Sequence, residues 1–112
     1  MDITIYVYNE KIIIMEVIGG IDGSSASQLQ DVITNACETE QHLLFDMSKV
    51  HFMTSAGLRV MLLLHRQLQQ NDARVVLVGM LAPIHDVMDA TGFLKHFDTA
   101  LDHDSGAKLL GV

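Results

Sequence analysis

The alternation of apolar and polar residues at the start of the chain predicts two strands. From Ile3 to Tyr8, apolar and polar side chains take turns at every second position, which is typical of a half-buried strand. We expect the apolar set to face the core: Ile3, Ile5 and Val7. After a short connection, Lys11 to Ile18 is dominated by β-branched residues, so the two segments are expected to pair as an antiparallel hairpin.

Helical periodicity replaces this alternation in two longer segments. Ser25, followed three residues later by Gln28, has the pattern of a capping box and predicts a helix beginning at Ser25. Its apolar face recurs at helical spacing: Ala26, Leu29, Val32, Ile33 and Ala36. A second helix is predicted from Ser55 to about Gln69, and it is apolar except along a narrow stripe: Arg59, Arg66 and Gln70.

The remaining elements complete an alternation of strands and helices. A short strand is predicted at His42 to Met47, and a second, almost entirely β-branched strand at Arg74 to Val78 is expected inside the sheet. A helix opens at Pro83 and ends at Gly92, and two short segments follow: an edge strand at Phe97 to Leu101 and helical turns at Ser105 to Leu110. Alternation of this kind implies parallel pairing with right-handed crossovers. With no linker or internal repeat, we expect a single α/β domain over residues 1–112.

Charge and composition argue against several classes of partner. The net charge is −7 and the seven basic residues are scattered, so neither nucleic acid nor an anionic membrane surface is expected as a partner. A single cysteine, Cys37, excludes an intramolecular disulfide. No leader-like segment precedes the first strand, and no apolar run approaches the ~20 residues of a membrane-spanning helix. We therefore expect a cytoplasmic protein.

The sequence gives no sign of cofactor or metal chemistry. None of the six histidines has metal-binding spacing, and the phosphate-loop patterns GxxxxGK[ST] and GxGxxG are absent. The segment Met53 to Gly57 lacks the leading glycine of a GxSxG nucleophile elbow. No cofactor is therefore expected, and an enzyme is disfavoured.

The most informative stretch, Leu43 to Leu64, reads as a buried strand, a polar loop and an apolar helix. Thr54 and Ser55 lie at the start of this helix, where unpaired N–H groups and the positive end of the dipole suit a phosphate. Ser55 could therefore be a plain N-cap or a regulated phosphoacceptor. Gly57 costs the helix roughly 1 kcal/mol, which indicates either close packing against a strand or the approach of a partner.

Two aspartates follow predicted strands. Asp22 and Asp46 lie at carboxyl ends of strands, where α/β sheets collect ligands and partners, although aspartates there also cap local N–H groups. Asp22 is expected beside the Ser55 junction, where a partner could reach it. Neither interpretation is excluded by the residues alone.

The segment Phe45 to Leu58, with Phe52-Met53-Thr54-Ser55-Ala56-Gly57 at its centre, resembles the signature of the STAS family of bacterial anti-sigma-factor antagonists. The resemblance includes Gly20-Ile21-Asp22 and the Val75 to Gly79 strand with the Pro83 helix, and it spans about Ile3 to Leu110. It implies a STAS-like α/β domain with a mixed sheet of four to five strands and helices packed mainly on one face.

The resemblance also implies a function. In that family, a partner that is both an anti-sigma factor and a serine-protein kinase binds the unphosphorylated protein and phosphorylates its serine, and a PP2C-type serine phosphatase reverses the change. Carried over, Ser55 is the phosphoacceptor, and the docking surface includes Asp22, Gly23, Met53, Gly57 and Arg59. The best-known members have aspartate immediately before this serine. Here that residue is Thr54, which becomes a weaker alternative acceptor.

Two other functions are consistent with the residues. The chain could be a constitutive STAS subunit of a transporter or signalling assembly, with Ser55 only capping a helix. It could also be a small enzyme that uses Ser55 or Cys37. The partner switch predicts that Ser55→Asp loses the kinase, whereas the subunit predicts that nothing changes.

Overall fold

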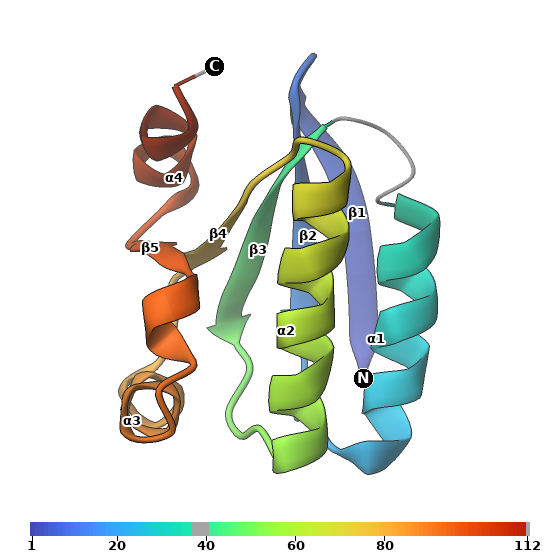
Figure 1. Ribbon diagram of the computed structural model, residues 1–112, viewed down its shortest axis with the longest axis vertical. Coiled ribbons are helices and arrows are strands. Elements are labelled where there is room, and N and C mark those ends of the chain that lie inside the picture. The colour runs from blue at the N-terminus through green and yellow to red at the C-terminus, as the bar shows by residue number, and fades with distance from the viewer. Residues whose placement is uncertain (37–40, 112) are drawn as a thin grey trace.

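Five strands form one mixed sheet in the order β1-β2-β3-β4-β5 (Figure 1). The computed structural model describes residues 1–36 and 41–111. The elements are β1 (Asp2–Asn9), β2 (Ile12–Ile18), α1 (Gly23–Ala36), β3 (His42–Lys49), α2 (Ser55–Gln70), β4 (Val75–Val78), α3 (Ala82–Ala90), the 3₁₀ turn η1 (Leu94–His96), β5 (Asp98–Ala100) and α4 (His103–Leu110). The predicted order of elements is confirmed, and most boundaries differ by one or two residues.

Strand pairing agrees with the prediction. β1 and β2 form the antiparallel hairpin, and β2, β3, β4 and β5 run parallel to one another. β4 lies between two strands, and all four of its residues are buried. The parallel run brings the carboxyl ends of β2 and β3 to one edge of the sheet, and both α1 and α2 begin there.

Three helices cover one face of the sheet, and α4 covers part of the other. α1 and α2 lie side by side along the first face (Figure 1) and enclose the larger core with α3. Every second residue along the strands faces this larger core, and these residues include Ile13, Met15, Val17, Phe45 and Leu77. α4 packs its Ala107 and Leu110 onto the opposite face of β2, β3 and β4. The expected arrangement, with helices mainly on one face, is confirmed.

The start of α1 differs from the prediction. The helix begins at Gly23, and Asp22 caps it: one carboxylate oxygen accepts hydrogen bonds from the N–H groups of Ser24 and Ser25, each at 3.0 Å. The Ser25 hydroxyl in turn accepts from the Asp22 N–H at 2.8 Å. A capping box is therefore present, but it lies one turn earlier, with Ser25 in its third helical position. The predicted start at Ser25 is wrong, because aspartate is an equally good N-cap.

The inward set predicted for β1 is also only partly right. Ile3 packs against the larger core, but Ile5 is 41% exposed and Val7 is 69% exposed. β1 is an edge strand, and of the predicted set only Ile3 packs against the core beneath the helices. In the described part of the chain, no helix combines the length and apolar character needed to cross a membrane.

Candidate functional site

Two loops join at the start of α1 and α2. Ile21, between β2 and α1, pairs with Met53, between β3 and α2, in an isolated parallel bridge. The Ile21 N–H donates to the Phe52 carbonyl at 3.1 Å, and the Thr54 N–H donates to the Ile21 carbonyl at 2.9 Å. This ladder holds the two helix N-termini together at the lower edge of the view in Figure 1. The Asp22 loop thus lies beside the Thr54–Ser55 junction, as the sequence predicts.

Gly57 makes this junction compact. A Cβ atom at Gly57 would lie 2.7 Å from the Ile21 Cγ2 atom, 2.8 Å from the Ile21 carbonyl oxygen and 2.8 Å from the Met53 Cγ atom. Because the first turn of α2 rests directly on the ladder, no side chain fits there. Of the two reasons that the sequence offered for this glycine, close packing is the one observed. Gly57 is buried, so it lets the two loops and α2 pack closely without itself lying on the surface.

The hydroxyl groups of Thr54 and Ser55 have different environments. Thr54 is the N-cap of α2, and its Oγ1 accepts from the Gly57 N–H at 3.5 Å and donates to the Ile21 carbonyl at 3.4 Å. Ser55 is the first helical residue and is exposed. Within residues 1–36 and 41–111, its hydroxyl has no hydrogen-bond partner. The interpretation of Ser55 as the cap is therefore wrong: Thr54 caps the helix and Ser55 is free.

The other predicted docking residues differ in their exposure and in their contacts. Gly23 and Arg59 are exposed, and a Cβ atom at Gly23 would meet no neighbouring atom within 4 Å. Met53 is partly buried against the larger core. Hydrogen bonds from the Ser25 N–H and from the hydroxyls of Ser24 and Ser25 lower the pKa of Asp22 to about 2. Asp22 is therefore ionised and engaged by its own helix.

Phe52 is a surface feature that the sequence analysis did not identify. Phe52 is 52% exposed, and its ring packs against Gly20, where a Cβ atom would come within 2.1 Å of the ring. Gly20 could have signalled this contact, but in the sequence it stood out only as part of the Gly20-Ile21-Asp22 motif. The result is a half-exposed aromatic side chain three residues before Ser55.

Asp46 has a structural role on the other face of the sheet. It is 7% exposed and accepts hydrogen bonds from the Ser48 N–H at 2.9 Å and the Ser48 hydroxyl at 2.7 Å. Its second carboxylate oxygen lies 2.7 Å from Nε2 of His103, at the start of α4. The anchoring interpretation of Asp46 is therefore the one observed, and it extends to α4 as well as to the local loop.

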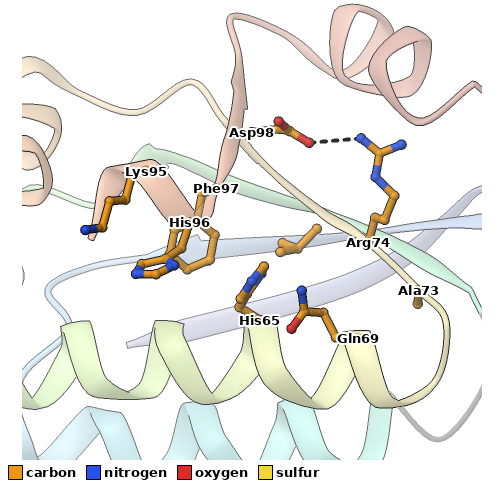
Figure 2. A pocket seen from close by; sticks show the side chains of 9 residues that line it. His65, Gln69, Ala73, Arg74, Lys95, His96, Phe97 and Asp98 are labelled. Carbon is orange, nitrogen blue, oxygen red and sulfur yellow. Dashed lines mark hydrogen bonds and ion pairs between the residues drawn. The ribbon is translucent and has the colours of Figure 1, made fainter. Parts of the chain in front are cut away.

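The pocket in Figure 2 lies away from the junction, beside the second half of α2. Its volume is 190 Å³, and its lining includes His65, Gln69, Lys95 and His96. Arg74 and Asp98, also in the lining, form an ion pair at 2.9 Å. Ser55 is at the opposite end of the same helix. Cys37, the other nucleophile considered, lies outside the described residues.

The family model for the STAS domain matches residues 4–106, and the chain therefore belongs to the STAS domain family. It is similar to BtrV of Bordetella bronchiseptica, by its name a candidate anti-sigma factor antagonist, with 29% identity over 90 residues that cover 80% of this chain and 78% of BtrV.

Two solved structures have the same fold. One is an anti-sigma factor antagonist from Mycobacterium paratuberculosis, with a TM-score of 0.79 and 24% identity over 99% of this chain and 96% of that one. The other is the murine anion transporter Slc26a9, with a TM-score of 0.80 and 14% identity. That match covers 90% of this chain but only 18% of the transporter.

Proposed function

We propose that this chain is an anti-sigma-factor antagonist in a phosphorylation-controlled partner switch. The observation that carries the proposal is the free, exposed hydroxyl of Ser55 beside a Thr54 whose own hydroxyl caps the helix. The unphosphorylated form binds a cytoplasmic anti-sigma factor that is also a serine-protein kinase. Phosphorylation of Ser55 releases this partner, and a PP2C-type serine phosphatase restores binding. The chain itself is a regulator, not an enzyme.

Ser55 suits the phosphoacceptor role better than Thr54. In the transfer, the Ser55 Oγ atom forms a bond to the γ-phosphorus of ATP on the kinase, the bond to ADP breaks, and a kinase base takes the hydroxyl proton. At Thr54 the same step would remove the N-cap and disturb the contact with Ile21. At Ser55 the cap stays intact, and the added charge lies at the favourable end of the helix dipole.

The phosphoryl group would act on the surface, leaving the core unchanged. It adds nearly two negative charges at an exposed position. A partner that covers the neutral hydroxyl would then have to bury a group that carries nearly two negative charges, which costs several kcal/mol. Release therefore needs no rearrangement of the sheet or helices.

The predicted docking residues take distinct parts in this proposal. Gly23 and Arg59 contact the partner directly because both are exposed. Met53 contributes its partly exposed side chain, and Asp22 and Gly57 fix the two loops from which the surface is built.

The test is capture of partners from a lysate of the native host, with bound proteins identified by mass. We compare the wild type, Ser55→Ala, Ser55→Asp and Ser55→Asn, which is the neutral match for aspartate in shape. Retention of a GHKL-type kinase by all except Ser55→Asp is the expected result. Equal retention by all four contradicts the switch.

The alternative is a constitutive STAS subunit of a transporter or signalling assembly. The structural likeness to part of Slc26a9 makes it worth testing. Because Thr54 already caps α2, this alternative leaves Ser55 without a role. It predicts that the same larger assembly is captured with every Ser55 variant.

A further inference from the structure

Arg59 is the charged side chain nearest to Ser55 along α2. The two residues are four positions apart and both are exposed. Residues at this spacing lie on one helix face with their Cβ atoms about 5–6 Å apart, which is within reach of an arginine side chain. The first turn of α2 contains no acidic residue that could compete for the guanidinium.

Arg59 also has no other charged partner in the described part of the chain. The ion pairs formed there by lysine and arginine are Lys49 with Glu16 and Arg74 with Asp98. Asp22, on the adjoining loop, is held by the N–H groups of its own helix. An exposed cation thus lies one helical turn from the free hydroxyl.

We propose that Arg59 binds the phosphoryl group of phosphorylated Ser55 in an ion pair within α2; this inference rests on the proposed phosphorylation of Ser55. A guanidinium can donate two parallel hydrogen bonds to a phosphate, which a lysine ammonium cannot do. The acid precedes the base by four residues, which is the favourable order on a helix. Asp22 adds a fixed negative charge on the neighbouring loop, so it repels the phosphoryl group.

The pairing gives phosphorylation a second effect on the docking surface. Before phosphorylation, Arg59 is free to contact an acidic or carbonyl group of the partner. Afterwards its guanidinium turns back along the helix to the phosphoryl oxygens. One modification therefore adds negative charge at Ser55 and withdraws a cation from the same surface.

The test uses the full chain with phosphoserine placed at position 55 during translation, so that no kinase is needed. The second proton of the phosphoryl group, which titrates near pH 6, is followed by ³¹P NMR. We compare Arg59 with Arg59→Gln and with Arg59→Lys. The matched control is Arg66→Gln, an exposed arginine two turns farther along α2.

We expect Arg59→Gln to lower the acid dissociation constant of the phosphoryl group by about twofold, the effect of one helix ion pair at this spacing. Arg59→Lys should give a smaller decrease, and Arg66→Gln none. The differences should disappear in about 1 M salt, where the Debye length is about 3 Å. Equal effects of Arg59→Gln and Arg66→Gln overturn the inference.

This experiment separates the inference from the proposed function. If Arg59→Gln behaves like the control while Ser55→Asp still loses the kinase, the switch holds without the ion pair. If the titration shows the pairing but every Ser55 variant captures the same proteins, the pairing is real and the switch is wrong.

Discussion

His103 and Asp46 are 57 residues apart in sequence, and their side chains meet at 2.7 Å across the face of the sheet that α4 covers. Because the Asp46 carboxylate is ionised and can only accept, Nε2 of His103 carries the proton that joins them. The contact connects the start of α4 to the end of β3. Among the described residues, it is the only contact between a basic side chain and a buried carboxylate.

Removal of the negative charge of Asp46 should destabilise the fold. Asp46→Asn keeps the shape of the side chain but presents one acceptor oxygen to three donor groups, from Ser48 and His103. We expect a loss of about 2 kcal/mol in the free energy of unfolding, measured with urea, since a neutral oxygen replaces the charged, buried acceptor of the hydrogen bonds from Ser48 and His103. Asp98→Asn is the control, because its ion pair with Arg74 is exposed and contributes less than about 1 kcal/mol.

The same site predicts a dependence on pH. Burial alone would raise the pKa of Asp46, but hydrogen bonds from Ser48 and His103 outweigh it, so the pKa lies below its usual value. The pKa of such a carboxyl group in the unfolded state is about 4, and above that pH the group stabilises the folded state fully. This contribution is lost as the pH falls through the lower pKa of the folded state. The gap in unfolding free energy between wild type and Asp46→Asn should therefore narrow in acid. A gap that widens in acid would contradict this assignment.

Thr54 and Ser55 should differ in their importance for stability. Thr54→Val removes the N-cap of α2 and should cost about 1 kcal/mol of unfolding free energy. Ser55→Ala should change it by no more than about 0.5 kcal/mol, because Ser55 is exposed and its hydroxyl has no hydrogen bond to lose in the described part of the chain. Urea unfolding of both variants provides the measurement. Equal losses would show that Ser55 shares the capping role.

Gly57 and Gly23 make a second matched pair. Gly57→Ala forces a Cβ atom to within 2.8 Å of the Ile21 carbonyl oxygen, and backbone cannot move aside as a side chain can. We expect a net loss of about 1–3 kcal/mol in spite of the better helix propensity of alanine. Gly23→Ala places its Cβ atom in open space at the start of α1 and should be neutral or stabilising. Thermal unfolding of the two variants tests the contrast.

Phe52 should contribute to partner binding more than to folding. Phe52 is half exposed and its ring packs against Gly20, so it offers an aromatic surface that can enter an apolar pocket of a partner. Phe52→Ala should weaken binding to the proposed anti-sigma-factor partner, once purified, by about tenfold or more, measured by titration calorimetry. Leu101→Ala is the control, since Leu101 is 91% exposed between β5 and α4. Equal affinities for the two variants would exclude Phe52 from the interface.

The sequence predicted the elements well because the apolar periodicity is strong in both strands and helices. It placed the starts of α1 and α2 less well, because several adjacent polar residues compete for each cap. Asp22 and Ser25 can both cap α1, and Thr54 and Ser55 can both cap α2; backbone geometry decides between them. Local pattern alone does not contain that geometry.

Contacts between distant segments were beyond sequence reasoning for a different reason. The pairing of Asp46 with His103 depends on how α4 returns across the sheet, and the ring of Phe52 over Gly20 depends on how two loops meet. Neither leaves a periodic signal. By contrast, the proximity of Asp22 and Ser55 could be predicted from the sequence, because parallel strands place their carboxyl ends together.

The separation of the cap from the free hydroxyl has a consequence for protein turnover. Degradation in cells follows the fraction of molecules that unfold, and a change of about 1–2 kcal/mol in stability is enough to alter abundance several-fold. Since Thr54 caps α2 whatever group Ser55 carries, and the phosphoryl group lies at the favourable end of the helix dipole, the phosphorylated form should last at least as long as the unphosphorylated one. A cell that modifies Ser55 would then redistribute the partners of this protein without losing the protein to degradation.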